Sequence, residues 1–208
     1  RHAFLVADMP FMSYTTPGQA LENSVRIMQK GGAMMIKLEA GDDQVDIVRH
    51  LARHDIPVCA HVGLKPQSVH KIGGFKVQGR DPDQASEMVD SAKRLQDAGA
   101  DIVLLECVPN EVGQRTTEAL DVPVIGIGAG PDVDGQILVL YDILDITQGR
   151  TPRFVKNFQQ GHDSPLAALQ AYVRAVKDRS YPAPEYCLPG AFSIHPLPVA
   201  RPTRSTQA

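Results

Sequence analysis

The sequence lacks several features that mark particular classes of protein. Its three cysteines, Cys59, Cys107 and Cys187, are far apart and form neither a CxxC pair nor a metal-finger spacing. No apolar run approaches the length of a membrane span, and no signal peptide is visible. The net charge of -3 provides no broad basic field that would hold nucleic acid or an anionic membrane. These absences favour a cytoplasmic protein with reduced thiols that acts on small molecules.

A repeated unit runs through most of the 208 residues: a short apolar run, a polar or glycine-rich stretch, and then an amphipathic segment. Continuous Val/Ile/Leu runs are typical of buried parallel strands. Their alternation with helical segments predicts an α/β fold with a parallel sheet and a single core. The expected strands are Ala3–Ala7, Ala33–Leu38, Pro57–Ala60, Asp101–Leu105, Pro123–Ile127 and Gln136–Leu140, and the expected helices are Gly18–Lys30, Asp43–His54, Pro82–Ala98 and Glu111–Leu120.

About six strand–helix units are visible, whereas a closed barrel of the (β/α)8 type needs eight strands. A doubly wound open sheet has no such requirement, so the number of units alone leaves both architectures open. At the start of the third expected helix, Asp81 or Asp83 could cap the first turn, and Gly99 would end the helix.

The pattern changes toward the C-terminus. One more amphipathic helix is expected at Ser164–Asp178, and the segment Tyr181–Ala208 after it contains six prolines. Proline continues neither a helix nor a central strand, so we expect an extended arm that grades into a disordered tail. The expected organisation is a partial barrel domain over residues 1–187 and a Pro-rich tail over residues 188–208.

Charged side chains follow four of the expected strands. Asp8 ends the first run, Lys37 and Glu39 end the second, His61 follows the third and Glu106 ends the fourth. The carboxyl ends of barrel strands build the active site, so these five side chains are expected at one rim. Asp8 and Glu39 offer oxygen ligands for Mg²⁺, which can stabilise the enolate of a chelating 2-oxo acid.

The same rim suggests roles for the other three residues. Glu106 could remove the proton from the carbon beside the keto group, Lys37 could pair with the substrate carboxylate, and His61 could donate a hydrogen bond to a substrate oxygen. Each residue also has a structural interpretation. Asp8 could form a turn, Lys37 and Glu39 could be a solvated ion pair, and His61 could be a core histidine.

Two glycine-rich segments also lie after expected strands. Gly126–Gly130 matches neither a dinucleotide-binding fingerprint nor a Walker motif, and we expect it to let the backbone approach a ligand closely. Lys71–Arg80 carries three positive charges, so it is either a solvated loop or a flap over an acidic co-substrate.

Seven strings in one order carry a family resemblance: VADMPFMSY, MIKLEAG, PVCAHVGLKPQSV, GGFKVQGRD, LLECVP, PVIGIGAG and DGQILVLYD. From about Phe4 to Cys187 the chain closely resembles the ketopantoate hydroxymethyltransferase family. The resemblance implies a (β/α)8 barrel of the phosphoenolpyruvate/pyruvate superfamily type. It also implies Mg²⁺ and homo-oligomers, often decamers. The implied reaction moves a one-carbon unit from 5,10-methylenetetrahydrofolate to 2-oxoisovalerate, giving 2-dehydropantoate, an early step to pantothenate.

Carried over to this sequence, the resemblance assigns Asp8 and Glu39 to the metal, and Asp8, Lys37 and His61 to the oxo acid. It assigns the role of base to Glu106. The family's first two strands and a Gly-Asp-Ser segment with a further metal ligand lie upstream of Arg1, so we expect a chain that lacks them. Two departures inside the match are Ala40 and Ala60, where glycine is expected.

Two alternatives remain at this point. One is a superfamily relative that cleaves C–C or P–C bonds through the same enolate chemistry, which the LLECVP and GGFKVQGR strings disfavour. The other is a catalytically incompetent barrel fragment, because a barrel without two strands has exposed sheet edges and tends to aggregate.

Overall fold

The computed structural model describes residues 3–190, which form an α/β fold around one parallel sheet. The order of the strands in the sheet is their order in the sequence, from β1 to β6, and every neighbouring pair is parallel. The strands are β1 (Val6–Asp8), β2 (Met35–Glu39), β3 (Val58–Gly63), β4 (Ile102–Glu106), β5 (Val124–Ile127) and β6 (Gly135–Gln136).

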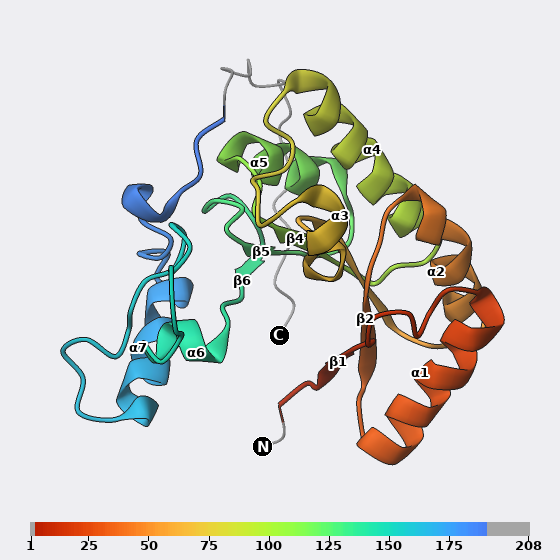
Figure 1. Ribbon diagram of the computed structural model, residues 1–208, viewed down its shortest axis with the longest axis horizontal. Coiled ribbons are helices and arrows are strands. Elements are labelled where there is room, and N and C mark those ends of the chain that lie inside the picture. Colours follow the sequence, from red (N-terminus) through yellow and green to blue (C-terminus); the bar gives the residue numbers. More distant parts are fainter. Residues whose placement is uncertain (1–2, 191–208) are drawn as a thin grey trace.

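This strand order decides between the two architectures that the sequence left open. A doubly wound sheet reverses its strand order at a switch point, and no reversal occurs between β1 and β6. The sheet instead winds in one direction and curls, with α1, α2, α4 and α5 along its outer side (Figure 1). The fold is therefore a curled half-barrel, and within residues 3–190 β1 and β6 are its edge strands.

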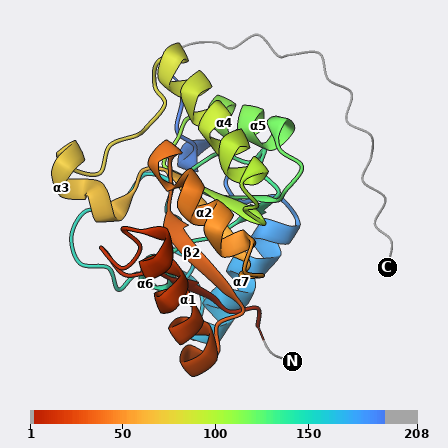
Figure 2. The ribbon, with the colours of Figure 1, turned by 90° about the vertical axis from the view of Figure 1, so that its right-hand side faces the viewer.

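Helices connect the strands and form an outer layer. Figure 2 looks onto this layer, where α1, α2, α4 and α5 follow one another around the sheet. The longer helices are α1 (Pro17–Gly31), α2 (Val45–Ala52), α4 (Pro82–Asp97), α5 (Asn110–Ala119) and α7 (Pro165–Lys177). Shorter turns are η1 (Asp42–Gln44), η2 (Pro66–Ser68), α3 (Val69–Ile72), α6 (Leu140–Ile143) and η3 (Pro184–Tyr186). None of the helices within 3–190 is long and apolar enough to span a membrane.

The ends of the long helices follow their sequence signals. At α1, Thr16 accepts a hydrogen bond from the backbone of Gln19, Pro17 occupies the first turn, and Gly32 ends the helix in the left-handed region. Asp81 caps α4 in the same way through the backbone of Gln84, which confirms one of the two expected caps.

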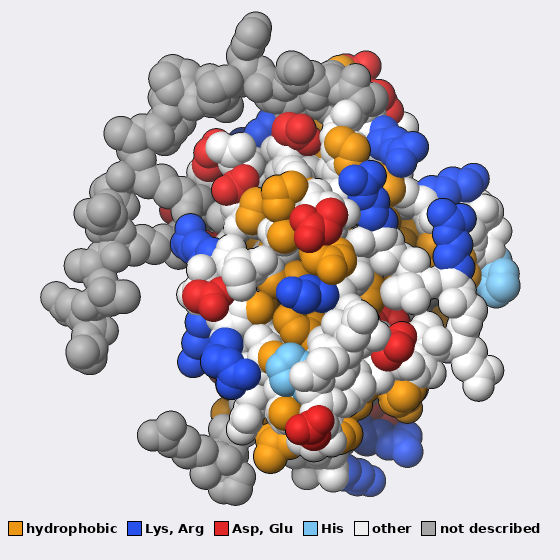
Figure 3. All heavy atoms as spheres, turned by 90° about the vertical axis from the view of Figure 1, so that its left-hand side faces the viewer, with side chains coloured by type: hydrophobic (Ala, Val, Ile, Leu, Met, Phe, Trp, Pro, Cys, Tyr) orange, Lys and Arg blue, Asp and Glu red, His pale blue; other side chains and the backbone are white. Residues whose placement is uncertain are grey.

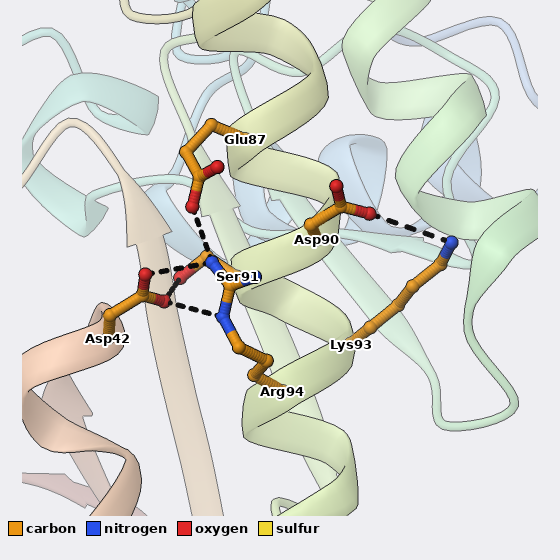
Figure 4. Close-up of polar contacts among 6 residues, drawn as sticks. All are labelled: Asp42, Glu87, Asp90, Ser91, Lys93 and Arg94. Atoms are coloured by element: carbon orange, nitrogen blue, oxygen red, sulfur yellow. Dashed lines mark hydrogen bonds and ion pairs between the residues drawn. The ribbon is translucent and has the colours of Figure 1, made fainter.

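A salt-bridge cluster fastens α4 to the turn after β2 (Figure 4). Arg94 donates from Nε and Nη2 to the two carboxylate oxygens of Asp42, at 2.9 and 2.8 Å, and Ser91 Oγ donates to Asp42 at 2.8 Å. Glu87, one turn before Ser91 on α4, also accepts from Arg94. The fork of the guanidinium matches a carboxylate, so the contact fixes direction as well as distance.

The sheet separates two groups of buried side chains. Because side chains alternate along a strand, Ile36 and Leu38 of β2 pack outward against the helices, whereas Met35 faces inward. On β3 and β4, Cys59 and Leu104 belong to the inward group. Lys37, Glu39, His61 and Glu106 have the same parity as these inward residues, so the strands turn them toward the concave face.

The expected last strand, Gln136–Leu140, is wrong in extent. β6 is Gly135–Gln136, Ile137 donates one more backbone hydrogen bond to Gly126, and Leu140 already begins α6. The apolar run continues beyond the end of β5, its one neighbouring strand within residues 3–190, because β5 stops at Ile127. Several apolar side chains of this region are exposed, and Figure 3 shows hydrophobic and charged groups interspersed on this side of the molecule.

The start of the Pro-rich arm packs against the domain. Tyr181 is buried and its hydroxyl donates to the carbonyl of Phe154, and Leu188 is buried with its carbonyl accepting from the backbone of Asn110. A turn, η3, lies between them. The expected disorder of the tail concerns residues that are mostly outside 3–190, since the described part ends at 190.

Candidate active site

The five side chains expected at one rim lie at the carboxyl ends of β1 to β4. Four of them form a continuous series of contacts across the strands. Lys37 Nζ lies 2.7 Å from Asp8 Oδ2 and 3.4 Å from His61 Nδ1, and His61 Nε2 lies 3.1 Å from Glu106 Oε2. The structure therefore brings an acid, an amine, an imidazole and a second acid into direct contact.

The contacts of His61 indicate which of its ring nitrogens carries the proton. An ammonium group can only donate, so the neutral imidazole accepts from Lys37 at Nδ1 and carries its proton at Nε2. That proton faces Glu106, although the geometry at 3.1 Å does not meet the alignment of a hydrogen bond and Nε2 has no such partner within 3–190. The imidazole is almost completely buried, with a side-chain exposure of 3%. It is thus held at one nitrogen and available at the other.

Glu39 lies apart from this series of contacts. Its Oε1 accepts a hydrogen bond of 2.8 Å from the backbone of Gln67, whereas Oε2 is buried without a hydrogen-bond partner in the described structure. Burial raises the pKa of Glu39, and Asp8 adds to this, although the Gln67 hydrogen bond and the positive charge of Lys37 oppose it. A buried carboxylate oxygen without a partner is costly, so this oxygen is suited to a ligand.

Asp8 and Glu39 supply carboxylate oxygens, the donor type that Mg²⁺ takes from proteins. Within residues 3–190, no three His, Cys, Asp or Glu side chains are grouped so that they could enclose a metal. Mg²⁺ characteristically binds through one or two carboxylates and completes its shell with water and substrate oxygens. The buried, unpartnered Oε2 of Glu39 is the observation on which this fit depends.

Gly63 allows the end of β3 to approach the end of β4. Its φ is +94°, and a Cβ there would lie 2.3 Å from the carbonyl oxygen of Glu106. The next residue, Leu64, donates its N–H to that same carbonyl at 2.9 Å. The backbone of Glu106 is therefore held directly beside the strand that carries His61.

The glycine-rich loop after β5 packs closely against other parts of the protein. Protein atoms fill the positions that side chains would take at Gly128 and Gly130, and the expected approach of the Gly126–Gly130 backbone to a ligand stays a prediction. A Cβ at Gly128 would lie 2.4 Å from the ring of Phe154, and one at Gly130 would lie 2.7 Å from Asn110. These glycines permit close packing within the protein.

The loop Lys71–Arg80 is anchored at one end to the site. Gln78 donates its backbone N–H to the carbonyl of Cys107, the residue after Glu106, at 2.9 Å. Phe75, near the middle of the loop, has 73% of its surface exposed. The loop thus joins the site next to Glu106, and its expected role as a flap stays a prediction.

The cysteines nearby are unsuited to nucleophilic chemistry. All three cysteines are free and buried. Burial raises the pKa of Cys59 to about 12 and that of Cys107 to about 11, so both remain thiols at neutral pH.

Sequence reasoning did not single out two residues that the structure adds to the site. Gln67 and Tyr14 contact each other, and Gln67 also contacts Glu39. Both lie inside strings that carry the family resemblance, PVCAHVGLKPQSV and VADMPFMSY. Their polar side chains follow the ends of β3 and β1, which was the one signal that could have identified them.

A one-way parallel sheet with acid–base side chains at its carboxyl ends defines a barrel-type enzyme. The family model described as ketopantoate hydroxymethyltransferase matches residues 1–184, and the chain belongs to this family of transferases.

Curated relatives agree with this assignment. The chain is 58% identical over 180 residues to a 3-methyl-2-oxobutanoate hydroxymethyltransferase of Alkalilimnicola ehrlichii, covering 86% of this chain and 65% of the relative. It is 54% identical to relatives in Hahella chejuensis and Nitrosococcus oceani, covering 89% and 86% of this chain and 70% and 68% of theirs. The chain thus spans about two thirds of the length of these relatives.

Among solved structures, a dihydrodipicolinate synthase from Bacillus anthracis is similar to 60% of this chain and 45% of its own, with 15% identity and a TM-score of 0.42.

Proposed function

We propose that this chain carries the catalytic residues of a hydroxymethyltransferase that acts on 2-oxoisovalerate in pantothenate biosynthesis. The one-carbon donor would be 5,10-methylenetetrahydrofolate, and the product 2-dehydropantoate. The observation that carries the proposal is the series Asp8–Lys37–His61–Glu106, with the unpartnered oxygen of Glu39 beside it. Membership of the family supports the same reaction.

Glu106 is the base in this proposal. Its side chain is 14% exposed, so a substrate can reach the carboxylate while bulk water is largely excluded. The base removes the proton from the carbon beside the keto group, and the electron pair of that C–H bond becomes the enolate. Water adds to the methylene carbon of the donor and breaks both of its C–N bonds, which releases tetrahydrofolate, with a proton on each freed nitrogen, and formaldehyde. The enolate carbon then adds to the formaldehyde carbon, and the resulting alkoxide takes up the proton that Glu106 removed and becomes the hydroxymethyl group.

His61 and Lys37 serve the oxygens of the oxo acid. The Nε2 proton of His61 is not committed to a hydrogen bond within the described structure, so it can be donated to a substrate oxygen. Lys37, held between Asp8 and His61, keeps a positive charge beside the substrate carboxylate. Asp8 is 54% exposed, so the oxo acid can reach its carboxylate while Asp8 pairs with Lys37.

Asp8 and Glu39 would hold Mg²⁺, with waters and the oxo acid completing its shell. When bound, the ion supplies Lewis-acid stabilisation for negative charge that develops on the keto oxygen. The role of Glu39 is to present one oxygen while its other oxygen is fixed by the Gln67 N–H. A homo-oligomeric assembly is part of the same proposal.

The base assignment can be tested by deuterium exchange. Glu106→Gln keeps the shape of the side chain and removes its basicity. We expect exchange at the carbon beside the keto group of 2-oxoisovalerate, followed by proton NMR in D2O with Mg²⁺, to fall at least about 100-fold. Binding of the oxo acid should change little.

The matched control is Glu22→Gln, the same substitution at an exposed position on α1. It should exchange the substrate at the rate of the unaltered chain. Exchange that is equally fast in Glu106→Gln would contradict the assignment of the base.

A further inference from the structure

We infer that Gln67 is a positioning residue that sets the two proposed magnesium-binding carboxylates relative to each other, and that Tyr14 orients its amide. The inference rests on the proposed magnesium site. It concerns two residues outside the contacting series, on the loops after β3 and β1.

Gln67 contacts both ends of the proposed metal site. Its backbone N–H donates to Glu39 Oε1 at 2.8 Å, and its side-chain Nε2 donates to the carbonyl of Met9 at 2.9 Å. Met9 directly follows Asp8 in the chain and is completely buried. One residue therefore connects Glu39 on β2 with the backbone beside Asp8 on β1.

The Met9 end of this connection is rigid. The backbone N–H of Met9 donates to the carbonyl of Lys37 at 2.8 Å, and Ser24 on α1 donates to its sulfur at 3.7 Å. Displacement of the Met9 carbonyl would thus disturb the hydrogen bond between the end of β1 and β2. The Gln67 amide acts on an anchored group, which is what a positioning contact needs.

The hydrogen bonds allow only one orientation of the amide. The carbonyl of Met9 can only accept, so the NH2 group of Gln67 must face it. The amide oxygen then faces Tyr14, whose hydroxyl must be the donor in their 2.6 Å contact. The hydrogen bonds therefore run in one direction, from Tyr14 through Gln67 to Met9. No other orientation of the amide keeps both bonds.

Two substitutions separate the contributions of Gln67 and Tyr14 to this hydrogen-bond network. Gln67→Leu removes both side-chain hydrogen bonds and keeps the backbone N–H that donates to Glu39. Tyr14→Phe removes only the hydroxyl that orients the amide. We expect Gln67→Leu to weaken Mg²⁺ binding, measured by titration calorimetry, about 10-fold, and Tyr14→Phe to weaken it by a smaller factor.

The double variant gives the sharpest test. Because Tyr14 acts through the Gln67 amide, its hydroxyl has nothing to orient once Gln67 is leucine. The Mg²⁺ affinity of Tyr14→Phe/Gln67→Leu should therefore equal that of Gln67→Leu alone, since effects within one network are not additive. A loss of affinity in the double variant equal to the product of the two single losses would mean that the two residues act independently. That result would overturn the proposed network.

Matched controls separate positioning from loss of folding. Gln170→Leu on α7 and Tyr141→Phe on α6 make the same chemical changes at exposed positions and should leave Mg²⁺ affinity unchanged. Circular dichroism at the titration temperature should show all variants folded. A variant that lowers the melting temperature but keeps the Mg²⁺ affinity has a structural role, and that result would overturn the inference.

The outcome is distinguishable from failure of the proposed function. If the unaltered chain binds no Mg²⁺, both the metal assignment and this inference are wrong, whereas the base assignment of Glu106 is judged by its own exchange measurement. If the unaltered chain binds Mg²⁺ and both single variants bind it equally well, this inference alone is wrong.

Discussion

At Gly63 the end of β3 packs directly against the end of β4. Gly63→Ala would place a Cβ 2.3 Å from the Glu106 carbonyl, and that oxygen belongs to backbone that cannot rotate away. We expect a loss of about 1–3 kcal/mol in the free energy of unfolding, because the two strand ends must separate. Urea denaturation measures this loss.

A control distinguishes the close contact from backbone strain. Gly149 has a φ of +99°, similar to the +94° of Gly63, but a Cβ there would meet nothing within 4 Å. Gly149→Ala carries the same conformational strain without the contact, so it should be clearly less destabilising. Equal losses in the two variants would show that the approach to Glu106 contributes nothing.

The rim residues could be predicted from the sequence, but the residues that hold them could not. Glu39, His61 and Glu106 end apolar runs, and strand alternation places them on one face. Gln67 contacts Glu39 through a backbone N–H and Met9 across 58 residues of sequence, and such contacts depend on how two loops meet. No local sequence pattern specifies how these two loops pack against each other, so only the structure shows the contacts of Gln67.

At the scale of the elements, the Asp42–Arg94 contact fastens α4 to the turn after β2 (Figure 4). Burial raises the pKa of Asp42, but hydrogen bonds from Ser91 and Arg94 outweigh it and lower the pKa below its usual value. A carboxyl with a depressed pKa stabilises the fold above its unfolded pKa of about 3.9, and this stabilisation is lost as the pH falls through the folded pKa.

Asp42→Asn should therefore lower the melting temperature at pH 7 by a few degrees at most, since the contact is on the surface. The difference from the unaltered chain should persist down to about pH 4 and then shrink as Asp42 becomes protonated. Calorimetric melting across this pH range is the measurement. Asp43→Asn, on the same turn but exposed and without a side-chain hydrogen bond or ion pair to any residue in 3–190, should show no comparable pH dependence.

The element boundaries show where sequence patterns fail. The runs that became β2 to β5 each have a strand on both sides, and their predicted positions agree with the structure within a few residues. The last run, Gln136–Leu140, is similarly apolar, but within residues 3–190 it has one neighbouring strand, which ends at Ile127. A strand lasts only as long as there is backbone to pair with, and the length of the neighbour is not a local property of the sequence.

At the scale of the whole molecule, the start of the C-terminal arm, within residues 181–190, packs as part of the folded domain. Tyr181 packs edge-on against Phe158 and Tyr172, and its hydroxyl donates to the Phe154 carbonyl. Tyr172 in turn donates to the carbonyl of Gln136 on β6 at 3.0 Å. The arm and α7 are thereby joined to the last strand through aromatic side chains.

Tyr181→Phe should destabilise the chain by about 1–3 kcal/mol, because it leaves the Phe154 carbonyl without its donor in a buried place. Chemical denaturation followed by circular dichroism gives the difference. Tyr186→Phe provides the comparison, since Tyr186 belongs to the same aromatic group but its hydroxyl makes no hydrogen bond within the described part of the chain. Similar losses in both variants would contradict a role for the hydroxyl.

The rim residues themselves favour the correct register of the sheet. Lys37 is paired with Cys59, and His61 with Leu104, so all four face the same side. If β3 paired one residue out of register, His61 would turn into the apolar layer beneath the helices, and Ala60 and Val62 would replace it on the concave face. An imidazole among aliphatic side chains is unfavourable, so the residues that serve the reaction also select against misaligned sheets.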